Sequence, residues 1–92
     1  MGIKMIVYGK VQGVNFRWNT KKIADNLKIH GIVKNQNDGS VYIEAYSNNI
    51  LTIKKFIDII KSCPAPNGYV TNIEITKNNS NFKKYNNFQI IK

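Results

Sequence analysis

Residues 32–46, Ile-Val-Lys-Asn-Gln-Asn-Asp-Gly-Ser-Val-Tyr-Ile-Glu-Ala-Tyr, predict a β-hairpin in the middle of this chain of 92 residues. The tripeptide Asn37-Asp38-Gly39 is a strong turn signal, because Asp-Gly pairs favour tight hairpin turns. The segment before it, Ile32–Asn35, is β-prone. After the turn, residues 41–46 alternate between apolar and polar side chains, and we place the face with Val41, Ile43 and Ala45 on the core.

On both sides of this hairpin the chain changes to helical periodicity. Before the hairpin, apolar positions recur at helical spacing from Phe16 to about Ile29, and Gly31 is the expected stop signal. After the hairpin, Ser47-Asn48-Asn49 can cap a second helix that begins near Ile50. Pro64 and Pro66 lie beyond its expected end and prevent its continuation.

Further β-prone segments complete the pattern at residues 3–9, 69–76 and 88–91, and the polar stretch 77–81 is expected to be a loop. The resulting order is β-α-β-β-α-β with a short extra strand. This order predicts an α+β, ferredoxin-like sandwich, with one antiparallel sheet and both helices on one face. The length allows one domain, residues 1–92, and the fold alone decides no function.

Composition and charge restrict the class of protein only broadly. The apolar fraction of 42% is typical of a globular domain, and the single cysteine, Cys63, cannot form an internal disulfide. There is no apolar run long enough to span a membrane and no signal-peptide pattern, so we expect a cytoplasmic protein. The net charge of +9 is explained equally well by solvated lysines or by attraction of an anion, either a phosphate metabolite or a nucleic acid.

One arginine, Arg17, stands among 14 basic residues, and the others are lysines. Arginine differs from lysine in that its planar fork of donors can bind phosphate oxygens bidentately. Arg17 follows a loop flanked by Gly9 and Gly13, which leads into the first predicted helix. Glycines allow the backbone N–H groups to approach a ligand, and a helix N-terminus favours an anion. From these physical features alone, an anion site and a plain connector are about equally well supported. The spacing fits neither a Walker loop nor a dinucleotide-binding loop.

Two segments carry a resemblance to a known family. Gly9-Lys10-Val11-Gln12-Gly13-Val14-Asn15-Phe16-Arg17 resembles the first signature of the acylphosphatase family, and residues 31–41 resemble the second. The expected element order also matches that family's ferredoxin-like fold over nearly the whole chain. Two departures are Ile32, where an aromatic residue is usual, and Lys10; we expect altered packing at Ile32 and retained chemistry.

The resemblance implies hydrolysis of acyl phosphates to a carboxylate and inorganic phosphate, without a metal or other cofactor. By position, Arg17 corresponds to the family's substrate-binding arginine and Asn35 to the asparagine that holds the attacking water. The matching phosphate-binding loop is Val11, Gln12, Gly13, Val14, Asn15 and Phe16, acting through backbone N–H groups together with Arg17. The expected partners are the acyl phosphate and inorganic phosphate or other anions, with no membrane, and we expect a monomer.

Two other functions stay open at this point. An RNA-binding module would use the same fold, with Tyr42 and Tyr46 as stacking rings on the outer face of the sheet, although Glu44 lies between them. A catalytically silent, anion-binding relative is the second alternative. We expect Phe16 and Trp18 to serve packing rather than ligand contact, and His30 to be solvated.

Overall fold

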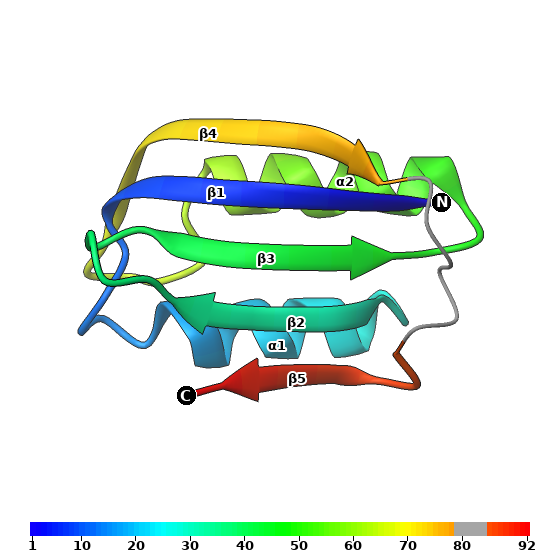
Figure 1. The fold of residues 1–92 in the computed structure, drawn as a ribbon, viewed down its shortest axis with the longest axis horizontal. Coiled ribbons are helices and arrows are strands. Elements are labelled where there is room, and N and C mark those ends of the chain that lie inside the picture. Colours follow the sequence, from blue (N-terminus) through cyan, green and yellow to red (C-terminus); the bar gives the residue numbers. More distant parts are fainter. Residues whose placement is uncertain (79–84) are drawn as a thin grey trace.

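Two helices and five strands follow one another in the predicted order in the computed structural model, which describes residues 1–78 and 85–92 (Figure 1). Their bounds are β1 Gly2–Lys10, α1 Phe16–Asn26, β2 His30–Asn35, β3 Val41–Tyr46, α2 Ile50–Lys61, β4 Tyr69–Asn78 and β5 Phe88–Ile91. The predicted polar loop 77–81 therefore begins later than expected. Residues 77 and 78 belong to β4 and the remaining three lie outside the described residues.

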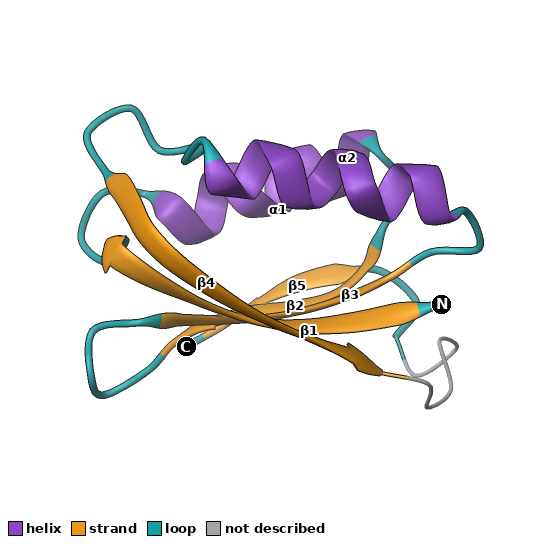
Figure 2. Ribbon diagram, turned by 90° about the horizontal axis from the view of Figure 1, so that it is seen from above, coloured by secondary structure: helices purple, strands orange, loops and turns teal. Residues whose placement is uncertain are grey.

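The five strands form one sheet in the order β4-β1-β3-β2-β5, and both helices cover the same face of it (Figure 2). The predicted antiparallel pairing holds for β4, β1, β3 and β2. It does not hold for β5, which pairs in parallel with β2. The reason is the direction of the chain: β4 ends at the side of the sheet where β2 begins, so β5 enters there and runs alongside β2 (Figure 1).

The hydrophobic core lies between the sheet and the two helices. Val41, Ile43 and Ala45 are fully buried, which confirms the inward face predicted for β3. Helix α2 contributes Phe56, whose ring meets that of Phe88 edge-on at 6.2 Å between centroids. Offset and edge-on aromatic pairs of this kind stabilise a core beyond the area that they bury. Phe88 thereby anchors β5 to the core, although this strand is only four residues long.

Helix α1 ends at Asn26, three residues earlier than predicted, and the stop is Lys28 rather than Gly31. Lys28 has a left-handed backbone with φ 58°. The Ile29 N–H bonds to the Ala24 carbonyl at 2.8 Å and the Lys28 N–H to the Asp25 carbonyl at 3.1 Å. This is the Schellman arrangement, here with lysine in the place that glycine usually takes.

Gly31 does not end α1; it allows close packing of two strands in the sheet. A Cβ on this residue would lie 1.8 Å from the Glu44 carbonyl oxygen, and the backbone has φ 151°. Only glycine allows β2 and β3 to approach so closely at this position. At the start of α2, Asn49 Oδ1 accepts from the Leu51 N–H at 2.9 Å, which confirms the predicted cap. Neither helix in the described part of the chain is long and apolar enough to cross a membrane.

Candidate active site

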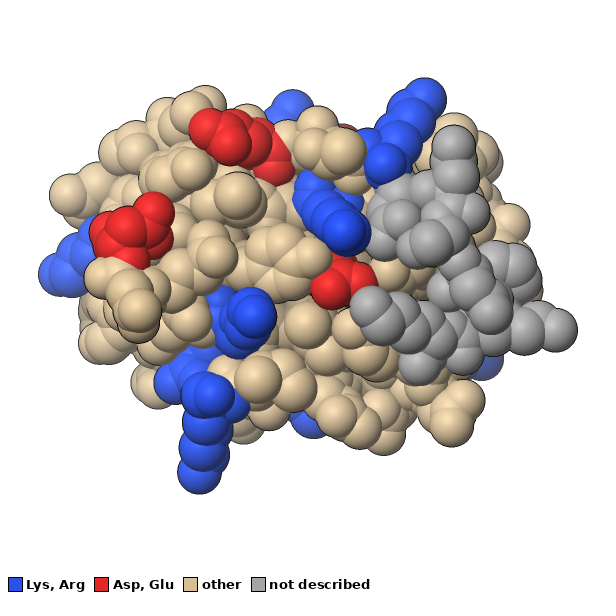
Figure 3. Space-filling model, in the orientation of Figure 1, with Lys and Arg blue, Asp and Glu red and all other residues tan. Residues whose placement is uncertain are grey.

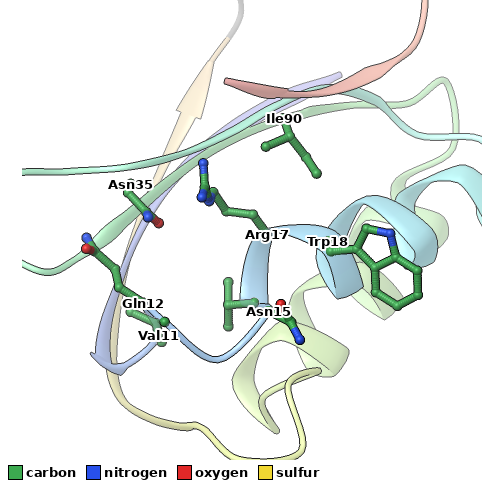
Figure 4. Close-up of a pocket in the computed structure, with 9 residues that line it drawn as sticks. Val11, Gln12, Asn15, Arg17, Trp18, Asn35 and Ile90 are labelled. Atoms are coloured by element: carbon green, nitrogen blue, oxygen red, sulfur yellow. The ribbon is translucent and has the colours of Figure 1, made fainter. Parts of the chain in front are cut away.

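A pocket of about 280 Å³ opens at the end of the sheet where β1 leads into α1 and β2 stops (Figure 4). Its walls come from the β1–α1 loop, the first turn of α1, the end of β2 and the final strand. The lining residues are Val11, Gln12, Gly13, Asn15, Phe16, Arg17, Trp18, Asn35 and Ile90. The structure thus brings Arg17 and Asn35, which are distant in sequence, to one cavity.

The backbone of the β1–α1 loop turns through two left-handed residues, Gly13 with φ 73° and Asn15 with φ 64°. Asn15 is also the residue that precedes α1, and its side chain does not cap the helix. Among the described residues, no acceptor bonds to the backbone N–H groups of residues 12–18. Together, the left-handed turns and the open first turn of α1 present free N–H donors beside the pocket, an arrangement that suits an anion.

Arg17 is half-buried, and it is the charged residue among the described residues that line the pocket. Its Nη1 donates to the backbone carbonyl of Ile91 at 3.2 Å. In Figure 4 the side chain extends from α1 toward the side of the pocket where Asn35 lies. A guanidinium has five N–H donors, so the bond to Ile91 leaves the others available for a ligand.

Asn35 is the last residue of β2 and is exposed, in register with Val41 of β3. The hairpin turn follows it directly. Inside this turn Asp38 Oδ1 accepts from the Ser40 hydroxyl at 2.5 Å and from the Ser40 N–H at 2.9 Å. The Ser40 hydroxyl, and after it the Ser40 N–H, lower the pKa of Asp38 below its ordinary value. The turn therefore contains a carboxylate that bonds within the turn and is not one of the lining residues of the pocket.

Val14 belongs to the loop predicted to bind phosphate, yet it is not one of the lining residues. Its side chain packs against the hydrophobic core. The other predicted members of the loop line the pocket. Phe16 does so while buried at 1% exposure, as expected for a packing residue.

Two lining residues were missed by the sequence reasoning. Trp18 was expected to pack, but it is 55% exposed and lines the pocket; Lys22 Nζ lies 4.5 Å from the centroid of its ring. Its position next to Arg17 was the signal that could have placed it there. Ile90 comes from β5, and no motif marked it.

Tyr42 and Tyr46 on the outer face of the sheet do not form the open pair of stacking rings that the RNA-binding alternative needs. Tyr46 is only 2% exposed, and its hydroxyl donates to Glu44 Oε1 at 2.7 Å. Tyr42 donates to Glu44 Oε2 at 2.9 Å, and desolvation together with this carboxylate raises its pKa above the ordinary value. Basic and acidic side chains are interspersed on this face (Figure 3). Glu44 thus accepts from both tyrosine hydroxyls, and the buried ring of Tyr46 is not open to a stacked base.

Residues 1–78 and 85–92 contain no group of three or more His, Cys, Asp or Glu side chains that could hold a metal ion. The predicted exposure of His30 is observed, and its Nδ1 lies 3.1 Å from the carbonyl oxygen of Tyr85.

Fold and pocket together define a class: a small α+β sandwich whose first strand–helix loop, with an arginine and a distant asparagine, lines a cavity at one end of the sheet. A sequence profile described as Acylphosphatase matches residues 3–90. The chain belongs to the acylphosphatase family.

Individual relatives agree with this assignment. An acylphosphatase of Ligilactobacillus salivarius is 49% identical over 87 residues, which cover 95% of this chain and 93% of the relative. An acylphosphatase of Borrelia garinii is 44% identical, with 91% and 90% covered. The crystal structure of acylphosphatase from Bacillus subtilis superimposes with a TM-score of 0.91 at 34% identity and covers 99% of this chain and 98% of that one. The predicted family and fold are confirmed.

Proposed function

We propose that this chain is an acylphosphatase that hydrolyses the carboxyl–phosphate bond of acyl phosphates without a metal ion. The observation that carries the proposal is one pocket lined by the β1–α1 loop, Arg17 and Asn35, in a chain of the acylphosphatase family. The phosphoryl group lies against the free N–H groups of residues 12–18, and Arg17 binds two of its oxygens.

The chemistry needs positioning more than covalent help, because an acyl phosphate has a carboxylate as its leaving group. Water attacks phosphorus, the new O–P bond forms, and the P–O bond to the acyl group breaks. The products are the carboxylate and dihydrogen phosphate, which takes both protons of the water. The loop N–H groups and Arg17 stabilise the negative charge on the equatorial oxygens in the transition state.

Asn35 places the attacking water in this proposal. A carboxamide is both donor and acceptor, but it is not a base at neutral pH. Its role is therefore to orient the water, and the phosphate oxygens of the substrate receive the proton. The described residues that line the pocket include no carboxylate or imidazole that would act in its place.

We further propose that residues 1–92 act as a monomeric single domain in the cytoplasm. The proposed site uses residues of this chain. The lone Cys63, which is partly buried, agrees with a reducing compartment.

The test of the proposed function is hydrolysis of benzoyl phosphate by the purified protein with EDTA present. We expect turnover that EDTA does not reduce, and no comparable hydrolysis of a simple phosphate monoester, which lacks the activated leaving group. In water labelled with heavy oxygen, the label is expected in phosphate. Absence of turnover at micromolar enzyme, or label in benzoate, would contradict the proposal.

A further inference from the structure

Gln12 joins the β1–α1 loop to the hairpin between β2 and β3. Its Nε2 donates to the carbonyl oxygens of Gln36 and Ser40, both at 2.8 Å. Two carbonyl acceptors identify this end of the side chain as the NH₂ group, because the amide oxygen cannot donate. Both protons of the group are used, so the carboxamide is fixed in the mouth of the turn.

The turn that receives Gln12 is closed by its own bonds. The Gln36 N–H donates to the Ser40 carbonyl at 2.9 Å, and the Gly39 N–H donates to the Gln36 carbonyl at 3.2 Å. The Gln36 side chain adds a bond to the Ser40 hydroxyl at 2.9 Å. A turn held in this way moves as a unit, so the two bonds from Gln12 fix its position relative to the loop.

Asn35 immediately precedes this turn. The peptide that links Asn35 to Gln36 therefore connects the candidate water-binding amide to one acceptor of Gln12. In Figure 4 the Gln12 and Asn35 side chains lie on the same side of the pocket, facing Arg17. The Gln12 side chain therefore bonds the loop proposed to bind the phosphoryl group directly to the turn that follows Asn35. Gln12 and Asn35 line the same pocket.

We propose that Gln12 is a positioning residue, whose side chain sets the separation between the phosphoryl-binding loop and the water held by Asn35. This inference rests on the proposed function. It differs from the expected role of Gln12 in the loop, which uses only the backbone N–H group. Attack in line with the breaking bond depends on this separation, and an error of about 1 Å can cost about 10²-fold in rate.

The test begins with Gln12→Met, which keeps a similar length and volume and removes both donors. We expect kcat for benzoyl phosphate to fall by about tenfold to hundredfold. The inhibition constant of inorganic phosphate should stay within about twofold, because the loop N–H groups and Arg17 are retained. The matched control is Gln89→Met, an exposed glutamine of β5 whose amide bonds to Asn87 at 2.9 Å; its kinetics should be unchanged.

A double-mutant cycle with Asn35→Ala separates positioning from a general structural effect. If Gln12 acts through Asn35, Gln12→Met should lower kcat only slightly further once Asn35 has been replaced. Fully additive losses would overturn the inference, as would an unchanged kcat in Gln12→Met. A loss that appears equally in phosphate binding would also overturn it, because Gln12 would then only shape the loop.

Thermal unfolding of each variant shows whether it folds. If Gln12→Met does not fold, Gln12→Asn replaces it in the same cycle, since the shorter amide cannot reach both carbonyls. Failure of the inference is distinguishable from failure of the proposed function. In the first case the unmodified protein turns over benzoyl phosphate and the Gln12 variants do too; in the second the unmodified protein shows no turnover.

Discussion

At the scale of single residues, the phosphate-binding role that we propose for Arg17 depends on the shape of its side chain as well as on its charge. One N–H of its guanidinium is bonded to the Ile91 carbonyl, which holds the group at the edge of the pocket. The remaining donors lie in one plane and match two oxygens of a phosphoryl group. A lysine at this place would supply a point charge that cannot make both sets of bonds.

We therefore expect Arg17→Lys to lower kcat/KM for benzoyl phosphate by about 10²–10³-fold, as for the loss of other fixed transition-state donors. The measurement is steady-state kinetics, together with the inhibition constant of inorganic phosphate, which should rise. The control is Lys55→Arg on the exposed side of α2, which also exchanges lysine and arginine but lies outside the pocket. Its kcat and KM should equal those of the unmodified protein. Near-normal kinetics of Arg17→Lys would refute the role given to this arginine.

At the scale of elements, β2 and β3 approach each other closely where Gly31 passes Glu44. A Cβ on Gly31 would lie 1.8 Å from the Glu44 carbonyl oxygen, and a backbone atom cannot move aside as a flexible side chain can. Gly39 in the turn has a positive φ of 92°, but a Cβ added there would meet no atom within 4 Å. Both glycines have a positive φ, but only at Gly31 is an added Cβ also obstructed, so the comparison shows the additional cost of crowding.

We expect Gly31→Ala to lower the free energy of unfolding by about 3 kcal/mol or more, because the strands must move apart. Gly39→Ala should cost about 1–2 kcal/mol, from its left-handed backbone alone. Urea unfolding of both variants checks this order. Equal destabilisation would contradict the close approach of β2 and β3.

The β2–β3 turn also predicts sensitivity to acid through Asp38. Its pKa is lowered in the folded protein by the Ser40 hydroxyl and N–H, so the unfolded chain binds a proton more readily than the folded one. The stabilisation is present above the ordinary aspartate pKa of about 3.9 and is lost as the pH falls through the lower folded value. Asp38→Asn should therefore reduce the loss of stability between about pH 5 and pH 2.

Urea midpoints across this pH range measure the effect, with Asp58→Asn, an exposed aspartate of α2, as the control. An Asp38→Asn variant with the same pH dependence as the unmodified protein would show that the Ser40 bonds do not lower this pKa.

The elements themselves could be predicted from the sequence because their signals are local. The alternation of β3 and the Asn49 cap depend on neighbouring residues, and both were found as predicted. The end of α1 could not be predicted, since Lys28 adopts a conformation that lysine rarely takes. Gly31 was predicted to end the first helix, and this prediction was wrong. Its lack of a side chain instead allows close contact with Glu44 of β3, which is more than ten residues away along the chain.

At the scale of the whole molecule, we expect the net charge of +9 to attract the proposed anionic substrate at long range. Exposed charges attract such a substrate at low ionic strength, and salt screens the attraction over about 10 Å at 0.1 M. We expect kcat/KM to fall with rising sodium chloride, mainly through KM. A variant with Lys54→Glu and Lys55→Glu on α2, outside the pocket, should show a weaker salt dependence and the same kcat.

An unchanged salt dependence in this charge variant would show that the net charge does not assist substrate binding. The binding energy would then come from the pocket alone.

Features that depend on the packing of distant segments could not be predicted from the sequence. The parallel pairing of β5 with β2, and hence Ile90 in the pocket, follows from where β4 ends in the folded chain. The alternation of β3 correctly assigned Glu44 to the outer face, but it does not show that the tyrosine hydroxyls enclose the carboxylate. Arg17 and Asn35 could be paired only because both lie in family motifs, since the lone arginine and a common asparagine are weak signals separately.

The most direct test of the central claim, that one pocket divides phosphate binding and water placement between Arg17 and Asn35, is Asn35→Ala. On the same sample, kcat for benzoyl phosphate and the dissociation constant of inorganic phosphate are measured. We predict a loss of about 10²-fold or more in kcat, with phosphate binding within about twofold of the unmodified protein. An unchanged kcat, or a loss of phosphate binding equal to the loss of activity, would contradict the account.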